Sequence, residues 1–330
     1  MPFLAELFQL GVKAEATEGT YTAPGAANMA LLCANLQHRI IAPKAEREIR
    51  STTFSSHPHG SMGIGGEVSF EIDLYALTQT TKPAWVDPLA KACGVGSITG
   101  GGGSNPWVLN LLSANDLLNV PPCSISWNVN GYLRKLAGCR GDLSIVGKAG
   151  EPLRGRFRFL GVHVDPADAA FTGGVSFDAT ADDLPVLMGG SLALTAVAPA
   201  SNGLTTAEAI IENFEVALNN VLYLRPSANA AFGYASCQIT GRRPTMTIDP
   251  EWQTVAGFDH IEAMRKDYLY SFTTGLLAGA AADNNIILAA PRLQHIGLVE
   301  QNRGGILVAQ SEFALRGNAG DDEFTITLST

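Results

Sequence analysis

Hydrophobic and polar residues alternate along much of the chain with the period of two that is typical of a half-buried β-strand. Residues 67–74 are the clearest example, with apolar side chains at every even-numbered position and polar ones at every odd-numbered position. A second alternating run, 124–129, precedes Asn130-Gly131, a dipeptide typical of two-residue hairpin turns. The return strand begins at Tyr132. Further strands are expected at 142–146 and 154–160, which together predict an antiparallel meander.

Helical patterns are confined to two short segments. Residues 82–93 have a proline near their start and are followed by Gly94, and residues 254–266 form the second candidate. So few helices exclude all-α and doubly wound α/β folds. Two long loops, 44–66 and 94–106, lack a core pattern, and loops of this length are usually functional or mobile.

The two halves of the chain contain similar segments in the same order. GGEVSFEID at 65–73 has a counterpart in GRRPTMTID at 241–249, and each precedes a helix candidate. An Arg-Gly strand entry then follows in each half, at Arg140 and at Arg303, before a final strand. This order predicts a duplicated domain.

The repeat suggests a division of the chain into four parts. We expect an N-terminal arm over residues 1–25, a first domain over 26–166 that contains the loop 44–66, a linker over 167–190 and a second domain over 191–330. The linker region carries turn residues and no sustained period.

Composition narrows the class of protein. Charged residues make up 16% of the chain, against about 25% in a typical soluble domain, so we expect either a large buried surface or an exterior that is partly covered by partners. The net charge of −9 argues against a basic patch that binds nucleic acid. The N-terminus does not look like a signal peptide, and no apolar run is long enough to span a membrane. The five cysteines are expected to be reduced core residues.

The sequence offers little chemistry. His57 and His59 could hold a metal but have no evident third ligand nearby. The glycine-containing segments 94–100 and 141–148 miss the spacing of nucleotide-binding loops. We therefore expect no catalytic residues, no cofactor and no metal site, and a protein that is not an enzyme.

Three groups of segments carry a resemblance to a known family. They are 13–21 with the strand at 30–36, 130–132 with 138–141, and 211–220 with 239–245. In this order they resemble the tail tube proteins of long, non-contractile-tailed bacteriophages. The resemblance implies two tandem domains, each a small β-barrel or sandwich with one short flanking α-helix. It also implies rings of six such domains, supplied here by three chains, that stack into a tube.

The resemblance further implies partners and a location. The chain would bind itself in homotrimeric stacked rings, enclose the tape-measure protein, and meet the tail terminator and distal tail proteins at the ends of the tube. DNA would pass through without specific binding, and no membrane would be involved. The protein would be made in the host bacterial cytoplasm and reside in the virion tail.

Two sets of residues are candidates for this role. If one sheet lines the channel, its acidic residues would let DNA slide rather than bind. The lumen-facing candidates are Glu67, Glu71, Asp73, Glu212 and Glu215. The loop 44–66 and the N-terminal arm are expected to contact the adjacent ring, with candidate residues Lys44, Glu46, Arg47, Glu48, Arg50, His57 and His59.

Two other interpretations stay open at this point. One is a related phage tail or secretion-tube ring component, such as a tail terminator or hub ring. The other is a β-sandwich binding module, which would favour exposed aromatic platforms, although aromatic residues make up only 8% of the chain.

Overall fold

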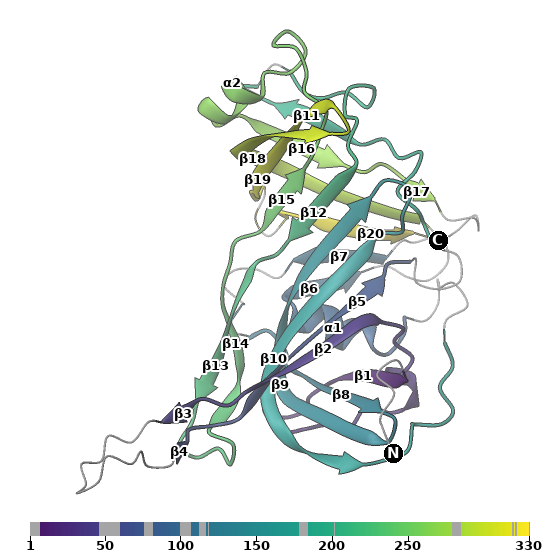
Figure 1. Ribbon diagram of the computed structural model, residues 1–330, viewed down its shortest axis with the longest axis vertical. Coiled ribbons are helices and arrows are strands. Elements are labelled where there is room, and N and C mark those ends of the chain that lie inside the picture. The colour runs from purple at the N-terminus through teal and green to yellow at the C-terminus, as the bar shows by residue number, and fades with distance from the viewer. Residues whose placement is uncertain are drawn as a thin grey trace, which may run out of the picture.

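The chain is mainly β, and its two halves contribute similar numbers of strands (Figure 1). The computed structural model describes residues 7–45, 60–75, 82–99, 107–111, 117, 119–177, 184–200, 202–278, 285–318, 320 and 322–329. The first half contains β1 (Phe8–Ala14), β2 (Ala34–Ile41), β3 (Lys44–Ala45), β4 (Gly60–Ser61), β5 (Gly65–Asp73), β6 (Val95–Thr99), β7 (Trp107–Leu111), β8 (Cys123–Val129), β9 (Tyr132–Lys148) and β10 (Arg154–Asp168), with helix α1 (Val86–Ala92) and the 3-10 turn η1 (Ala26–Asn28).

The second half follows the same scheme. It contains β11 (Ala193–Val197), β12 (Asn213–Ala217), β13 (Asn220–Pro226), β14 (Tyr234–Arg242), β15 (Thr245–Ile248), β16 (Leu269–Thr273), β17 (Leu277–Ala278), β18 (Asn285–Arg303), β19 (Ile306–Leu315) and β20 (Thr325–Ser329), with helix α2 (His260–Arg265). None of the helices in the described ranges is both long and apolar enough to cross a bilayer.

The predicted meander is confirmed. On β5, Val68, Phe70 and Ile72 are buried at 5% exposure or less, while the alternate positions face outward. The β8–β9 hairpin turns at Asn130 and Gly131, whose φ angles of 48° and 101° are those that a tight two-residue turn requires. Both helix candidates are also confirmed, although α1 and α2 are shorter than the segments predicted for them.

The order of paired strands is the same in both halves. The first half has the order β2-β5-β10-β9-β8-β1, and the second has β12-β15-β19-β18-β16-β11. A helix follows the second strand of each set, α1 after β5 and α2 after β15. The order along the chain also matches, so the duplication inferred from short segments extends to six strands and a helix.

The halves are joined edge to edge. The end of β9, residues 144–148, pairs antiparallel with β12, so one 16-stranded sheet contains strands of both halves. The hairpin β6–β7 of the first half pairs with β20, near the C-terminus. Strands are thus shared between the halves, and the boundaries expected at residues 166 and 191 stay a prediction.

The core continues across this junction. Phe214 on β12 is 2% exposed and packs its ring against Phe272 on β16, with ring centroids 6.0 Å apart. The same ring covers Gly147 on β9, where a Cβ atom would lie only 2.3 Å from it. Close packing of this kind leaves no room for a larger residue.

The N-terminal region differs from the arm expected over residues 1–25. Residues 8–14 form β1, which pairs with β8 along its whole length, and Leu10 and Val12 are buried. At the other predicted boundary, β10 continues to Asp168, beyond the strand expected at 154–160.

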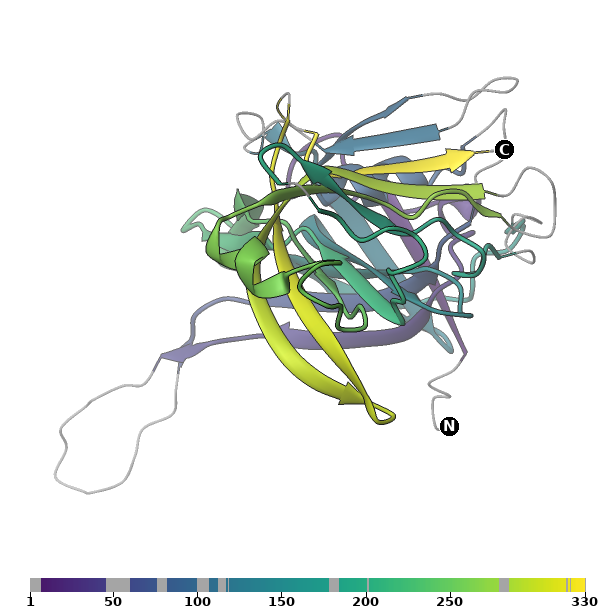
Figure 2. The same ribbon diagram turned by 90° about the horizontal axis from the view of Figure 1, so that it is seen from above.

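The long loop after β2 begins and ends as a projecting hairpin. Lys44 and Ala45 pair with Ser61 and Gly60, and β3 and β4 extend away from the body of the molecule (Figures 1 and 2). The corresponding hairpin of the second half, β13–β14, instead lies along the first half (Figure 1).

Candidate functional site

One face of the large sheet is polar across both halves. Directly opposed residues in antiparallel strands share a face, so the strand register assigns side chains to it from β2 to β19. We call it the polar face; it includes Arg39, Glu67, Glu71, Asp73, Ser144, Arg154, Arg156, Arg158, Glu215, Thr247 and Glu312. The opposite side of the same strands carries the buried phenylalanines of the core.

In the first half, the polar face carries a ladder of opposite charges between β5 and β10. Arg154 lies opposite Asp73 and Arg156 opposite Glu71, whereas Arg158 lies opposite Ser69 and contacts Glu67 diagonally. The Nε atoms of these arginines lie 3.2, 3.0 and 2.7 Å, respectively, from a carboxylate oxygen of the acidic residue that each contacts. Arg39 on β2 forms a second ion pair with Glu67.

The ladder changes the electrostatics expected from the acidic residues alone. Partial burial raises the pKa of Glu67, but hydrogen bonds from Arg158 and Arg39 outweigh burial and leave that pKa below its usual value. Each of the three predicted acidic residues of this half is therefore paired with an arginine. The Arg-x-Arg-x-Arg pattern at 154–158 is the sequence signal that could have revealed this.

The two candidates of the second half lie in different environments. Glu215 is on the polar face, opposite Val146 on one side and Thr247 on the other. Glu212 precedes β12 and lies 3.6 Å from Arg303, which also contacts Asp249 and Glu251 at 3.3 and 3.5 Å. Four of the five predicted acidic residues thus share one face, and Glu212 belongs to an ion-pair cluster at the end of β18.

Of the residues predicted to contact the adjacent ring, only Lys44 is within the described chain. It is exposed at the start of β3. The other six lie outside the described residues: Glu46, Arg47, Glu48, Arg50, His57 and His59.

A buried polar cluster fastens the β13–β14 hairpin to the first half. Arg140 on β9 is 2% exposed, and its guanidinium donates hydrogen bonds to the Val120 carbonyl at 2.8 Å, to the Cys237 carbonyl, and to Glu18 at 3.0 Å. Ser236 on β14 also donates to Glu18, at 2.6 Å. Burial raises the pKa of Glu18, but the hydrogen bonds from Ser236 and Arg140 outweigh it and lower that pKa below its usual value.

The sequence had marked Arg140 only as part of the repeat. Its side chain connects three segments that are distant along the chain: residues 15–22, β9 and β14. A buried guanidinium with several acceptors is expensive to disrupt, because removing one partner leaves another charge or carbonyl unpaired. This cluster therefore holds the two halves in a fixed relation.

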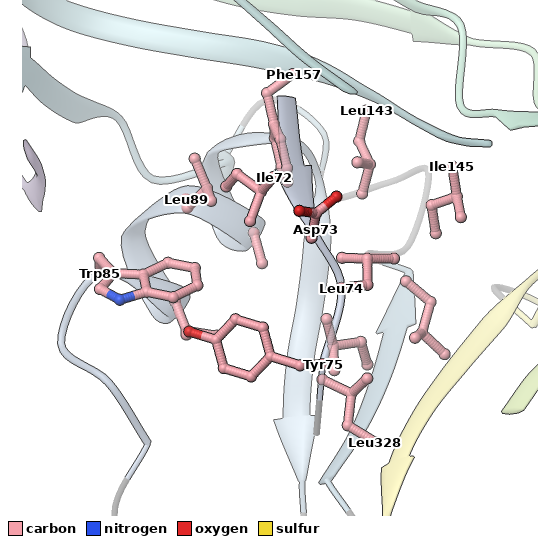
Figure 3. A pocket seen from close by; sticks show the side chains of 14 residues that line it. Ile72, Asp73, Leu74, Tyr75, Trp85, Leu89, Leu143, Ile145, Phe157 and Leu328 are labelled. Atoms are coloured by element: carbon pink, nitrogen blue, oxygen red, sulfur yellow. The ribbon is translucent and has the colours of Figure 1, made fainter. Parts of the chain in front are cut away.

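The cavity in Figure 3 lies between α1, β5 and the strands that face them. It has a volume of about 70 Å³ and is lined mainly by apolar side chains, with Trp85 and Tyr75 on one side and Leu143 and Ile145 on the other. Ligand and catalytic sites combine an apolar pocket with a few converging polar groups. This cavity lacks such a set of groups, and we interpret it as a packing gap between layers.

The cysteines are free thiols, as predicted. Cys93, Cys123, Cys139 and Cys237 are buried, and burial raises the pKa of each of these thiols. Among the residues that the structure describes, no group of three or more histidines, cysteines or acidic residues could hold a metal ion.

Comparison with known families decides the class of protein. The chain matches the family described as phage tail tube protein over residues 8–304, from β1 to the end of β18. The chain belongs to the phage tail tube protein family. No curated protein matches the chain.

This match confirms the resemblance to tail tube proteins and includes strands that form the polar face. A tail tube protein is a structural component of the virion tail, so family membership implies a structural role rather than catalysis. The match extends over both halves of the sheet, including the ladder on β5 and β10 and the junction between β9 and β12.

Proposed function

We propose that this tail tube protein forms rings of three chains, in which the two halves of each chain occupy six similar positions around a channel. The observation that carries the proposal is the repeated strand order combined with the contact between the halves. That contact is head to tail, because β9 of one half meets β12, the counterpart of β2, in the other. Head-to-tail contacts between similar units generate rings when the rotation closes.

We also propose that the polar face lines the channel of the stacked rings. The face extends over both halves, so six copies of it would surround the lumen. Binding to DNA depends on cations that neutralise phosphates, and here the arginines of β10 are already neutralised by carboxylates. A lining of this kind lets the genome pass without specific binding.

The remaining parts of the proposal concern partners and location. The lumen would hold the tape-measure protein during assembly, and the ends of the tube would meet the tail terminator and distal tail proteins. The chain would be made in the cytoplasm of the host bacterium and would function in the virion tail during genome ejection.

Negative-stain electron microscopy of the purified protein tests the ring. We expect stacked rings with an open pore, and image averages with threefold symmetry that approximates sixfold. Monomers that stay dispersed at high concentration would contradict the proposal.

Genome ejection tests the lining. Glu71→Lys and Glu215→Lys place uncompensated cations on the polar face, and we expect them to slow ejection from assembled particles because phosphates bind cations. Glu262→Lys, on helix α2 away from this face, is the matched control. Equal ejection rates in all three variants would exclude a channel-lining role for this face.

A further inference from the structure

Among the strand edges of the described chain that have a partner on one side only, two are counterparts of strands that are paired on both sides within the chain. β2 pairs with β5 alone, whereas its counterpart β12 pairs with both β15 and β9. Residues 297–303 of β18 pair with β19 alone, whereas the counterpart residues of β9 pair with both β10 and β12. Each of the two strands that form the junction between the halves therefore has an unpaired counterpart, β2 for β12 and residues 297–303 of β18 for β9.

The strand register defines which residues correspond. Met246 and Phe70 occupy the same place, since Met246 lies opposite Phe313 and Phe70 lies opposite Phe157. On the neighbouring strands, Glu215 corresponds to Ala34, because Glu215 is paired with the residue after Met246 and Ala34 with the residue after Phe70. In the same way, Val146 corresponds to Val299, which lies opposite Gln310 as Val146 lies opposite Arg154.

Exposure of apolar side chains distinguishes the open edges from the closed junction. On the second half, Val299 is 56% exposed, whereas its counterpart Val146 at the closed junction is half-buried. Ile296, beside this edge, is 45% exposed. On the first half, Ile40 on β2 is 58% exposed, and Leu32, which precedes the start of β2, is 46% exposed. Unpaired edges with exposed apolar residues promote association with another strand.

We propose that β2 of one chain pairs antiparallel with residues 297–301 of β18 in a second copy of the chain. The contact repeats the β9–β12 junction, so Ala34 lies opposite Val299 and Gln37 lies opposite Gly297. This inference rests on the proposed ring and specifies the contact that closes it.

The same relation places the projecting β3–β4 hairpin. Within the chain, β13 and β14 continue from the junction and lie on β9 and β10 of the first half, where Ser236 packs against Gly138. β3 and β4 correspond to this hairpin and extend from the open edge of β2 (Figure 2). In the proposed contact they lie on β18 and β19 of the second copy, in the same ring rather than in the adjacent one.

Cysteine cross-linking of assembled tubes tests the register. Ala34→Cys combined with Val299→Cys places two thiols on the same face of directly opposed residues, a separation that a disulfide can span with small adjustments. Cys33→Ser is included in every variant to remove the neighbouring thiol. Under mild oxidation, we expect covalent dimers and trimers on a non-reducing gel, with few larger species.

Two matched pairs control for geometry. Glu215→Cys with Val146→Cys reproduces the junction within one chain and should form a disulfide without changing the number of chains per species. Ala34→Cys with Gln301→Cys displaces one thiol by two residues, about 7 Å along the strand, and should link poorly.

The outcomes separate this inference from the proposed function. Tubes that form normally, with the internal control linked but no link between positions 34 and 299, would overturn the β2–β18 contact and leave the tube function intact. Preferential linking of positions 34 and 301 would overturn the register. Failure of the unsubstituted protein to form rings would instead contradict the proposed function itself.

Discussion

Arg156 on β10 lies directly opposite Glu71 on β5, with 3.0 Å between its Nε atom and the carboxylate Oε1. The pair is the middle rung of a ladder in which each strand carries one sign of charge. Because opposite charges on neighbouring strands attract one another, the ladder stabilises the pairing of β5 with β10.

Reversing the middle rung is expected to destabilise the fold modestly. Arg156→Glu faces Glu71 with a like charge and should lower the free energy of unfolding by about 1 kcal/mol, since these side chains are partly exposed. The double variant Glu71→Arg, Arg156→Glu should recover part of the loss. Urea denaturation at low and high salt measures this, and an effect that does not shrink at high salt would contradict an ionic cause.

The junction between the halves is expected to be intolerant of a single added methyl group. In Gly147→Ala, the new Cβ would meet the Phe214 ring at 2.3 Å, and such overpacking costs about 1–3 kcal/mol of unfolding free energy. Gly173→Ala is the matched control, because nothing lies within 4 Å of the new atom. Denaturation midpoints that shift equally in the two variants would show that the contact with Phe214 is unimportant.

Removal of the buried guanidinium is expected to be more severe. Arg140→Met removes the guanidinium donor from Glu18 and from the Val120 and Cys237 carbonyls, and breaking a buried charged contact costs about 3–5 kcal/mol. Arg140→Lys should restore little, because an ammonium group cannot reproduce the planar donor geometry. Thermal denaturation measures both variants. A wild-type midpoint for Arg140→Lys would indicate that charge alone, and not the fork of donors, holds the cluster.

Two buried histidines are expected to make stability depend on pH. His260 on α2 and His295 on β18 are 2% and 1% exposed, and burial lowers the pKa of each to about 4. A histidine in the unfolded chain has a pKa near 6.5. Between about pH 6.5 and pH 4, the unfolded state therefore binds more protons than the folded state. Stability should therefore fall as pH drops through this window, by on the order of 3 kcal/mol for each histidine.

A variant separates this effect from the titration of carboxylates. His295→Phe removes one of the two groups and should flatten the dependence of unfolding free energy on pH within this window. Curves for the variant and the unsubstituted protein that stay parallel from neutral pH down to 4 would exclude His295 as a source.

The parts of the fold with a strong local pattern could be predicted from the sequence. The alternation around Phe70 gave the strand and its buried face, and Asn130-Gly131 gave the hairpin. The strand at 8–14 was missed because Gly11 interrupts a short apolar pattern and its partner β8 begins more than 100 residues later. Pairing over such distances leaves no local signal.

The candidate site shows the same division. Glu71 and Glu215 were chosen for their charge and strand position, and the register does bring them to one face. The compensation of Glu71 by Arg156 depends on how β10 aligns with β5, which the alternation of each strand alone does not define. The contacts of Arg140 with Val120 and Cys237 depend on the placement of the β13–β14 hairpin and could not be derived from spacing.

The pairing of β9 with β12 also bears on how assembly responds to protein concentration. Both strands belong to one chain, so their association is intramolecular and its effective concentration is set by the connecting segment rather than by the solution. Dilution would separate chains from one another while each chain kept its own halves joined. In a ring of three chains, half of the contacts between neighbouring positions would thus form during folding, and only the other half would require collisions.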